Sequence, residues 1–167
     1  MSRSFLILCT CTVLIAASAS VTPQATVRVE AANLQDSRPL QDLTGKAAIR
    51  DYLQSWQALA AALEQNRAGL LDPDFVGSAK DTLTATIQQQ TALGISTRYQ
   101  DRSHDLQLVF YSPEGLSIEL TDHVEYDVQL LDQGRVKTTQ HVSARYLIVL
   151  TPAEVRWRVR VFQGTPR

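Results

Sequence analysis

An alternation of apolar and polar residues dominates the chain after Gly94 and constrains its fold more than any other feature. Such alternation is typical of β-strands that have one buried face. It occurs in four runs, which span residues 106–110, 116–131, 136–150 and 155–161. The separators are short and carry proline, glycine and acidic residues, so consecutive strands are expected to lie antiparallel. The sequence therefore predicts a four-stranded antiparallel meander.

The register of this sheet follows from the requirement that one face stay apolar. In the first hairpin this requirement pairs Leu106 with Asp122. In the second it pairs Asp122 with Ala144, and in the third it pairs Ile148 with Trp157. A slip by one residue would move every apolar side chain of a strand to the opposite face.

Two helical segments precede the sheet. From Gly45 to Asn66 the apolar residues recur at spacings of three and four, which predicts an amphipathic helix. Its apolar stripe comprises Ile49, Tyr52, Leu53, Trp56, Leu59, Ala60 and Leu63. A second helical region opens at Asp72 and Pro73, either as one kinked helix or as a short turn followed by a longer helix. The predicted fold class is α+β, with two or three helices packed on the concave face of a curved sheet.

The first 19 residues have the pattern of a secretory signal peptide. Arg3 precedes an apolar run from Phe5 to Ala17, and residues 17–19 read Ala-Ser-Ala, the small-x-small form of a cleavage site. The run is shorter than the roughly 20 residues that span a bilayer. We therefore expect a protein exported to the periplasm or the medium, with no stable membrane span; an uncleaved anchor is the alternative.

Residues 20–44 contain two prolines and little periodicity, which predicts a partly disordered leader apart from a short strand that Val27 and Val29 could form. Residues 45–167 are then expected to form one domain. Cleavage after residue 19 removes both cysteines, so an ordinary hydrophobic core rather than disulfides must hold the mature chain. Loss of Arg3 from the 16 basic residues leaves 15 against 17 acidic residues. This near-neutral balance argues against nucleic acid as a partner.

Asp122 interrupts an otherwise apolar row of alternate residues on the strand from 116 to 131. A carboxylate in a core is costly unless it is paired or protonated, and burial raises the pKa of such a group towards the range of a general acid or base. The first hairpin places His104 on the same face, diagonally next to Asp122. These two residues are the candidate catalytic pair. The alternative is a β-bulge near Thr121 that turns the acid outward.

Further inward positions carry side chains with polar tips. They are Tyr52, Trp56, Tyr126, Gln140 and Tyr146. We interpret them as candidates for a ligand pocket with apolar walls and a few directing groups, although the aromatic members could simply fill the core. His123 and His141 fall on the outer face without a cysteine or a closely spaced second histidine, so no metal site is expected. No phosphate loop or nucleotide fingerprint predicts a cofactor.

The order of these elements resembles the NTF2-like (SnoaL-like) superfamily over residues 47–163. The positions that carry the resemblance are Trp56, Phe75 with Gly77, the turn from Tyr111 to Gly115, and Trp157. The resemblance implies a curved sheet that wraps over helices to form a cone, whose mouth holds a ligand, a catalytic pair or a partner segment. Because this superfamily includes isomerases, dehydratases and non-catalytic domains, the resemblance does not imply a single function.

Three functions stay open at this level. The first is an exported non-catalytic domain that binds a hydrophobic small molecule or a partner peptide in its cone, with a homodimer through the sheet as an option. The second is a small isomerase- or dehydratase-type enzyme, in which Asp122 moves a proton, His104 orients it and an inward tyrosine stabilises negative charge. The third is a structural envelope protein with a filled core. An inward face rich in aromatic residues, with one acid and one histidine, favours the first.

Overall fold

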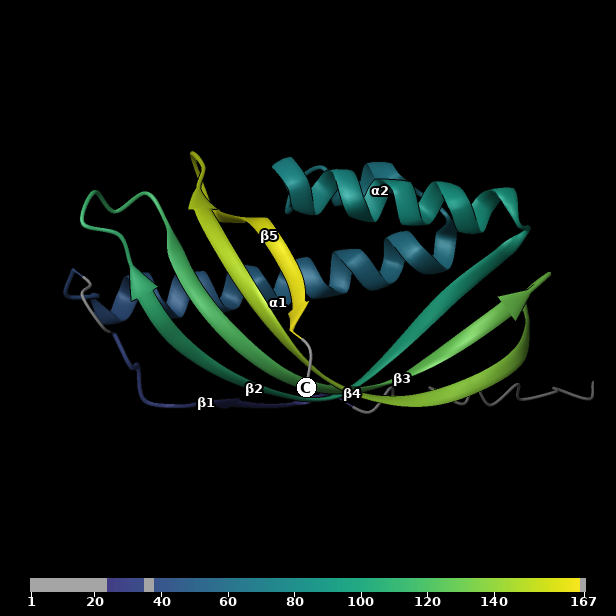
Figure 1. Ribbon diagram of the computed structural model, residues 1–167, viewed down its shortest axis with the longest axis horizontal. Helices are drawn as coiled ribbons and strands as arrows, with labels where there is room; N and C mark the ends of the chain where they lie inside the picture. The colour runs from purple at the N-terminus through teal and green to yellow at the C-terminus, as the bar shows by residue number, and fades with distance from the viewer. Residues whose placement is uncertain (1–23, 35–37, 166–167) are drawn as a thin grey trace, which may run out of the picture.

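The computed structural model describes residues 24–34 and 38–165, so the predicted signal peptide and part of the predicted leader lie outside the described residues. The described chain is α+β, with two helices and a five-stranded sheet (Figure 1). Its elements are β1 (Thr26–Val29), α1 (Asp42–Gln65), the 3₁₀ turn η1 (Ala68–Leu71), α2 (Gly77–Ala92), β2 (Ile95–Tyr111), β3 (Ile118–Asp132), β4 (Arg135–Pro152) and β5 (Trp157–Thr165). The predicted fold class is confirmed in outline and differs in detail.

The sheet combines the predicted meander with one additional strand. Strands β2 to β5 pair antiparallel in chain order, whereas β1 pairs parallel with β2. The pairing runs from Thr26 opposite Ser103 to Val29 opposite Leu106. The sheet is therefore mixed rather than purely antiparallel. Parallel neighbours need a long crossover, here the two helices, and four residues of alternation are too few to identify so distant a partner.

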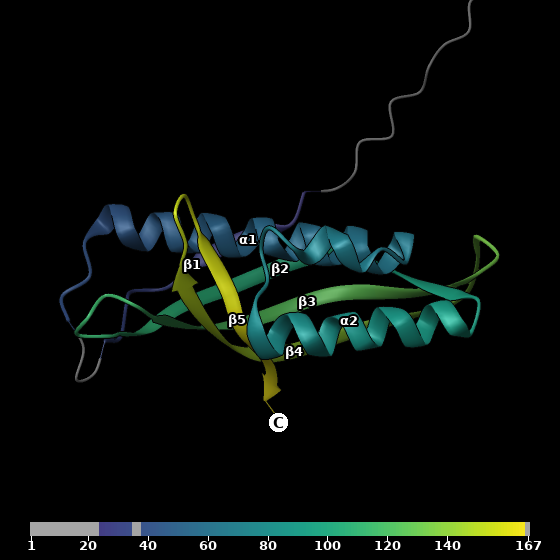
Figure 2. The ribbon, with the colours of Figure 1, turned by 90° about the horizontal axis from the view of Figure 1, so that it is seen from above.

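Both helices lie on the concave side of the curved sheet (Figures 1 and 2). The predicted apolar stripe of α1 is buried at Tyr52, Trp56, Leu59 and Leu63, whereas Ile49, Leu53 and Ala60 are only partly buried. The buried apolar residues of α1 are Ala48, Tyr52, Trp56, Leu59, Ala62 and Leu63. They share one core with the sheet residues Leu106, Ile118, Leu120, Val124, Ile148 and Leu150. Burial of this stripe holds α1 in place, because helices of globular proteins gain most of their stability from packing an apolar face.

The first hairpin has the predicted register at Leu106, which lies opposite Asp122. Past a shift after Leu108 the same register fails, because Phe110 lies opposite Glu119 rather than Ile118. The second hairpin does not have its predicted register, because Asp122 lies opposite Tyr146 rather than Ala144. The error is two residues. A shift of two leaves each side chain on its original face of the sheet, so apolar alternation alone cannot detect it.

A tight turn and a register shift, neither of which alternation reveals, together set the register of β3 and β4. The turn pairs Asp132 with Arg135, and the shift between Leu130 and Leu131 makes Lys137 an extra residue, so that Asp122 lies opposite Tyr146. Gln133 and Gly134 have φ values of 48° and 74°, as in the two-residue turns that join antiparallel strands tightly. In the last hairpin Ile148 lies opposite Phe162 rather than Trp157, so this prediction is also wrong. The pairing of β4 with β5 also contains a register shift, which leaves one extra residue in the hairpin. A prediction that assumes one constant register cannot account for it.

The segment between η1 and α2 covers the edge of β5. The Val76 amide donates to the carbonyl of Val159 at 2.9 Å, and the Val159 amide donates to the carbonyl of Asp74 at 2.8 Å. Phe75, between these two anchors, is fully buried. The segment thus satisfies backbone groups that a free edge strand would expose, and it closes the core over β5.

Replacing Phe75 with alanine should lower the free energy of unfolding by about 3–5 kcal/mol, because a large buried aromatic side chain leaves a cavity that the fold cannot close. Leu116→Ala is the control, since Leu116 is 63% exposed, and it should change stability by about 0.5 kcal/mol or less. Urea unfolding followed by circular dichroism measures both values. Equal losses for the two variants would contradict the role given to this segment.

Candidate functional site

Asp122 lies on the inner face of β3 and is fully buried. The Tyr52 hydroxyl of α1 donates to Asp122 Oδ2 at 2.7 Å, and His104 Nδ1 of β2 lies 2.7 Å from the same oxygen. The pairings of β3 with its neighbours shift register elsewhere and not at Thr121 or Asp122. The predicted proximity of Asp122 and His104 is therefore present, and the alternative of an outward-turning bulge is wrong.

His104 lies between two carboxylates. Its Nδ1 faces Asp122, and its Nε2 lies 4.0 Å from Asp101 Oδ2. Burial lowers the pKa of His104, but the interactions with Asp101 and Asp122 outweigh burial and raise this pKa to about 9. The imidazole is therefore protonated at neutral pH, and both of its N–H groups point towards acceptors. The interactions with the two carboxyl groups offset the cost of burying the charge of His104.

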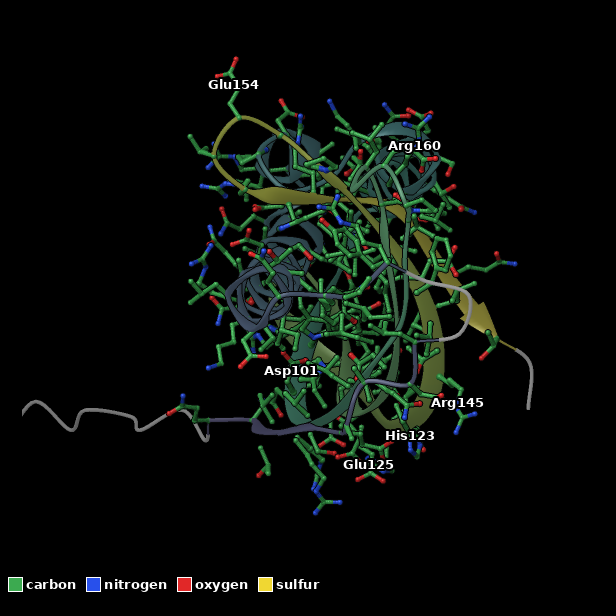
Figure 3. The ribbon with its side chains drawn as sticks, turned by 90° about the vertical axis from the view of Figure 1, so that its left-hand side faces the viewer. Asp101, His123, Glu125, Arg145, Glu154 and Arg160 are labelled. Carbon is green, nitrogen blue, oxygen red and sulfur yellow. The ribbon has the colours of Figure 1, made fainter. Side chains whose placement is uncertain are left out.

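Asp101 is the site residue that sequence reasoning missed. Arg102 is an extra residue in the pairing of β2 with β3. The inward-facing positions of β2 are therefore odd-numbered before Arg102 and even-numbered just after it. Consequently Asp101 and His104 both face the helices, and Figure 3 shows Asp101 on that side of the sheet. The sequence carries no signal for this change in the inward positions of β2, because the inward direction of Tyr99 is seen only in the structure, where its ring stacks on Trp56 with centroids 6.1 Å apart. Tyr99 and Leu106 both face inward, although one position is odd-numbered and the other even-numbered. The strand must therefore contain a bulge between them.

Trp56 connects this acid to the aromatic core. Its Nε1 donates to Asp101 Oδ1 at 2.5 Å, and its ring meets the His104 ring edge-on with centroids 5.3 Å apart. Tyr126 and Tyr146 also pack edge-on against Trp56, and their hydroxyl groups lie 3.0 Å from each other. Burial is the largest cause that raises the pKa of Tyr126, so this hydroxyl stays neutral.

The predicted pocket residues divide into three groups. Tyr52, Tyr126 and Tyr146 belong to the packed interior or to its margin. Trp56 is 1% exposed, yet it borders a cleft. Gln140 is exposed on β4, opposite Val128, and does not border that cleft. The centre of the cone is therefore largely filled with aromatic side chains, and the open space lies to one side.

That space is a cleft of about 760 Å³ between α1, β1 and β2. Apolar walls come from Val27, Leu53, Trp56 and Tyr99, and Asp101 and His104 also line it. The Asp101 side chain is 22% exposed, whereas that of His104 is 2% exposed, so the histidine is at the inner end. Clefts that bind small molecules combine such apolar walls with a few polar groups.

Asp122 has one further unusual feature. Its second oxygen, Oδ1, is buried and has no hydrogen-bond partner within residues 24–34 and 38–165.

Over the same residues, no group of three histidine, cysteine or acidic side chains is arranged to hold a metal ion. None of the helices in this described part is long and apolar enough to cross a membrane.

No protein-family model and no curated protein matches the chain. Solved structures do resemble it. The intermembrane-space region of the chloroplast protein ARC6 superposes with a TM-score of 0.61 and 12% identity, over 78% of this chain and 100% of that one. A putative scytalone dehydratase from Novosphingobium aromaticivorans gives 0.52 and 11%, over 75% and 89%. Aln2 from a Streptomyces species gives 0.51 and 11%, over 77% and 94%.

At these identities the likeness concerns the fold alone. The putative dehydratase and Aln2 nonetheless support the resemblance to the NTF2-like (SnoaL-like) superfamily that the order of elements implied. The chain has this cone-type α+β fold.

The raised pKa of His104 should make stability depend on pH. The folded protein binds this proton more tightly than the unfolded chain, because the pKa of His104 rises from 6.5 to about 9 on folding. The resulting stabilisation is complete below about pH 6.5 and is lost as the pH rises through about 9. We expect the free energy of unfolding to fall by up to about 3 kcal/mol over this range.

Urea unfolding at successive pH values measures this dependence. His104→Gln should remove the decrease between pH 6.5 and 9, whereas His123→Gln, at an exposed position on the outer face (Figure 3), should retain it. A His104→Gln variant that keeps the full pH dependence would refute the charged state assigned to this histidine.

Proposed function

We propose that this protein binds a small, largely apolar molecule in the cleft between α1, β1 and β2, without transforming it. The observation that carries the proposal is the cleft itself. Its volume of about 760 Å³ lies within the range of small-molecule sites, roughly 300–1,000 Å³. Apolar and aromatic side chains, Val27, Leu53, Trp56 and Tyr99, form part of its walls, and polar side chains such as Gln57, Arg98 and Asp101 line the rest.

The polar groups define what the ligand should offer. Asp101 already accepts from Trp56 Nε1, and its carboxylate is partly exposed in the cleft. A carboxylate has several acceptor positions, so a hydroxyl or N–H group of a ligand can share it. Leu53 and Tyr99 would cover the apolar body of such a ligand. A partner peptide would have to supply the same pattern, an apolar side chain next to a donor.

Export is part of the proposal. The first 19 residues have the pattern of a signal peptide, and the two cysteines of the chain lie within them at positions 9 and 11. A ligand-binding domain outside the cytoplasm would then depend on core packing alone, as the buried stripe of α1 allows. We therefore place the protein in the periplasm or the medium.

The binding proposal can be tested with 1-naphthol, a probe that has an apolar body and one hydroxyl group, in a panel of neutral apolar compounds. Binding to the folded state alone raises the melting temperature, so at least one panel member should raise it by several degrees. Val27→Asp places a charge on the cleft wall at a residue that is 44% exposed, and it should weaken binding at least tenfold in calorimetric titration.

Val155→Asp is the matched control, because Val155 is 84% exposed and does not line this cleft. It should bind as the unaltered protein does. A panel without effect on the melting temperature, or equal binding by the two aspartate variants, would remove the support for a ligand in this cleft.

A second candidate function is proton-transfer catalysis of the isomerase or dehydratase type. The observation that favours it is the buried Asp122–His104 pair at 2.7 Å, with Tyr52 on the same carboxylate oxygen. A positioned acid–base pair in a water-poor site commonly contributes about 10²–10⁴-fold to a rate. In this candidate the partly exposed carboxylate of Asp101 accepts the proton from the carbon next to a carbonyl group, and His104 donates a proton to the carbonyl oxygen at the inner end of the cleft. Asp122 holds the charge of His104, and Tyr52 orients Asp122.

Deuterium exchange distinguishes the two functions. If the protein only binds, 1-tetralone in D₂O should exchange the protons next to its carbonyl at the buffer rate when the protein is added, as proton NMR would show. Exchange above that rate, reduced at least about 100-fold in Asp122→Asn, would establish the catalytic function instead. Circular dichroism must show that the variant is folded, because Asp122 also holds Tyr52 and His104.

A further inference from the structure

A second cleft continues the first along α1. Its volume is about 800 Å³, and it is lined by Val29, Lys46, Ile49, Arg50, Gln54 and two residues of the first cleft. The shared residues are Leu53 and Gln57. The two clefts therefore meet along one side of the helix. Together they form a groove between α1 and the edge of the sheet that carries β1, which is named the α1–β1 groove below.

The α1–β1 groove is apolar but uncovered. Val27 and Val29, on alternate positions of β1, line the first and the second cleft respectively, yet they are 44% and 50% exposed. Ile49 and Leu53 on the helix side are only partly buried. Alternate strand residues that face a helix are normally packed against it. Here the described residues leave an apolar strip open to solvent.

The charged side chains that line the groove at its Lys46 end are both basic. Lys46 and Arg50 line the second cleft, and its lining contains no carboxylate. Arg50 donates from Nε and Nη2 to Asp51 Oδ1, at 2.9 and 2.7 Å, while its side chain is 67% exposed. Lys46 forms no hydrogen bond or ion pair with any described residue. The groove thus combines an apolar strip with an uncompensated cation at one end.

We propose that the α1–β1 groove binds a free single-chain anionic amphiphile, with its carboxylate at Lys46 and Arg50 and its apolar chain along Ile49, Leu53 and the valines of β1. The inference rests on the proposed function and names the ligand class for that site. Trp56 lies ten positions after Lys46 on α1, which corresponds to about 15 Å at 1.5 Å per residue. This length is close to that of an extended dodecyl chain.

The test compares dodecanoate with dodecanol, because the two differ in the charge of the head group and not in the apolar chain. Calorimetric titration of the full chain, below the concentration at which either compound aggregates, should show dodecanoate binding about tenfold more tightly, which corresponds to about 1.4 kcal/mol. Raising the salt concentration should reduce this preference, since salt screens exposed charges. The affinity for dodecanol should not fall in this way, because dodecanol carries no charge.

Lys46→Glu should abolish the preference for dodecanoate while leaving dodecanol binding within about twofold of the unaltered protein. Lys137→Glu makes the same change of charge on the hairpin between β3 and β4, where Lys137 pairs with Asp132 at 3.1 Å, and it should retain the preference. Val29→Asp, at the groove wall, should weaken the binding of both compounds.

Equal binding of dodecanoate and dodecanol, or a preference that survives Lys46→Glu, would overturn this inference and leave the binding of neutral ligands intact. Binding to vesicles of phosphatidylglycerol without binding to monomeric dodecanoate would also overturn it, because the partner would then be a membrane surface. If neither compound binds, the inference fails, and the panel of neutral compounds decides separately on the proposed function.

Discussion

The buried carboxylate of Asp122 is the constraint on which the rest of this structure depends. An unpaired charge in a core costs several kcal/mol, so the fold has to bring donors to it from elsewhere in the chain. Tyr52 comes from α1 and His104 from β2, which ties the helix to two strands through a single oxygen atom. This link fixes where α1 crosses the concave face. The position of α1 in turn determines where the cone is filled and where it stays open.

The bulge at Arg102 turns this structural constraint into a candidate site. Because the extra residue brings Asp101 to the same face as His104, the histidine is held between two carboxylates and is charged at neutral pH. Asp122 is fully enclosed, whereas Asp101 is partly exposed to the cleft. Asp122 therefore stabilises the charge of His104 from the closed side of the cleft, and Asp101 is accessible to a ligand. Bulges are frequent next to functional sites because they redirect a side chain in this way.

The interior of the cone is largely filled in this chain. Trp56 and the rings around it occupy the centre, so the accessible volume lies between α1, β1 and β2. Strand β1 is decisive for this arrangement, because it extends the sheet past β2 without packing closely on α1. Fold alone does not determine function in this class of protein. The groove beside β1 is a property of this chain's own residues.

Apolar periodicity alone determined the fold class, the burial of one stripe of α1, the inward direction of Asp122 and the presence of His104 beside it, because burial requires one face of each element to be apolar. Tertiary structure decided what that rule leaves undetermined. A register error of two residues keeps every face unchanged, so the partner of Asp122 on β4 had to come from the turn at Gln133 together with the register shift near Leu130. Asp101 entered the site through a bulge that reverses the parity of the inward positions, Gln140 is exposed to solvent, and β1 pairs with residues more than 70 positions later in the chain. Such contacts depend on long-range packing, and local alternation carries no information about them.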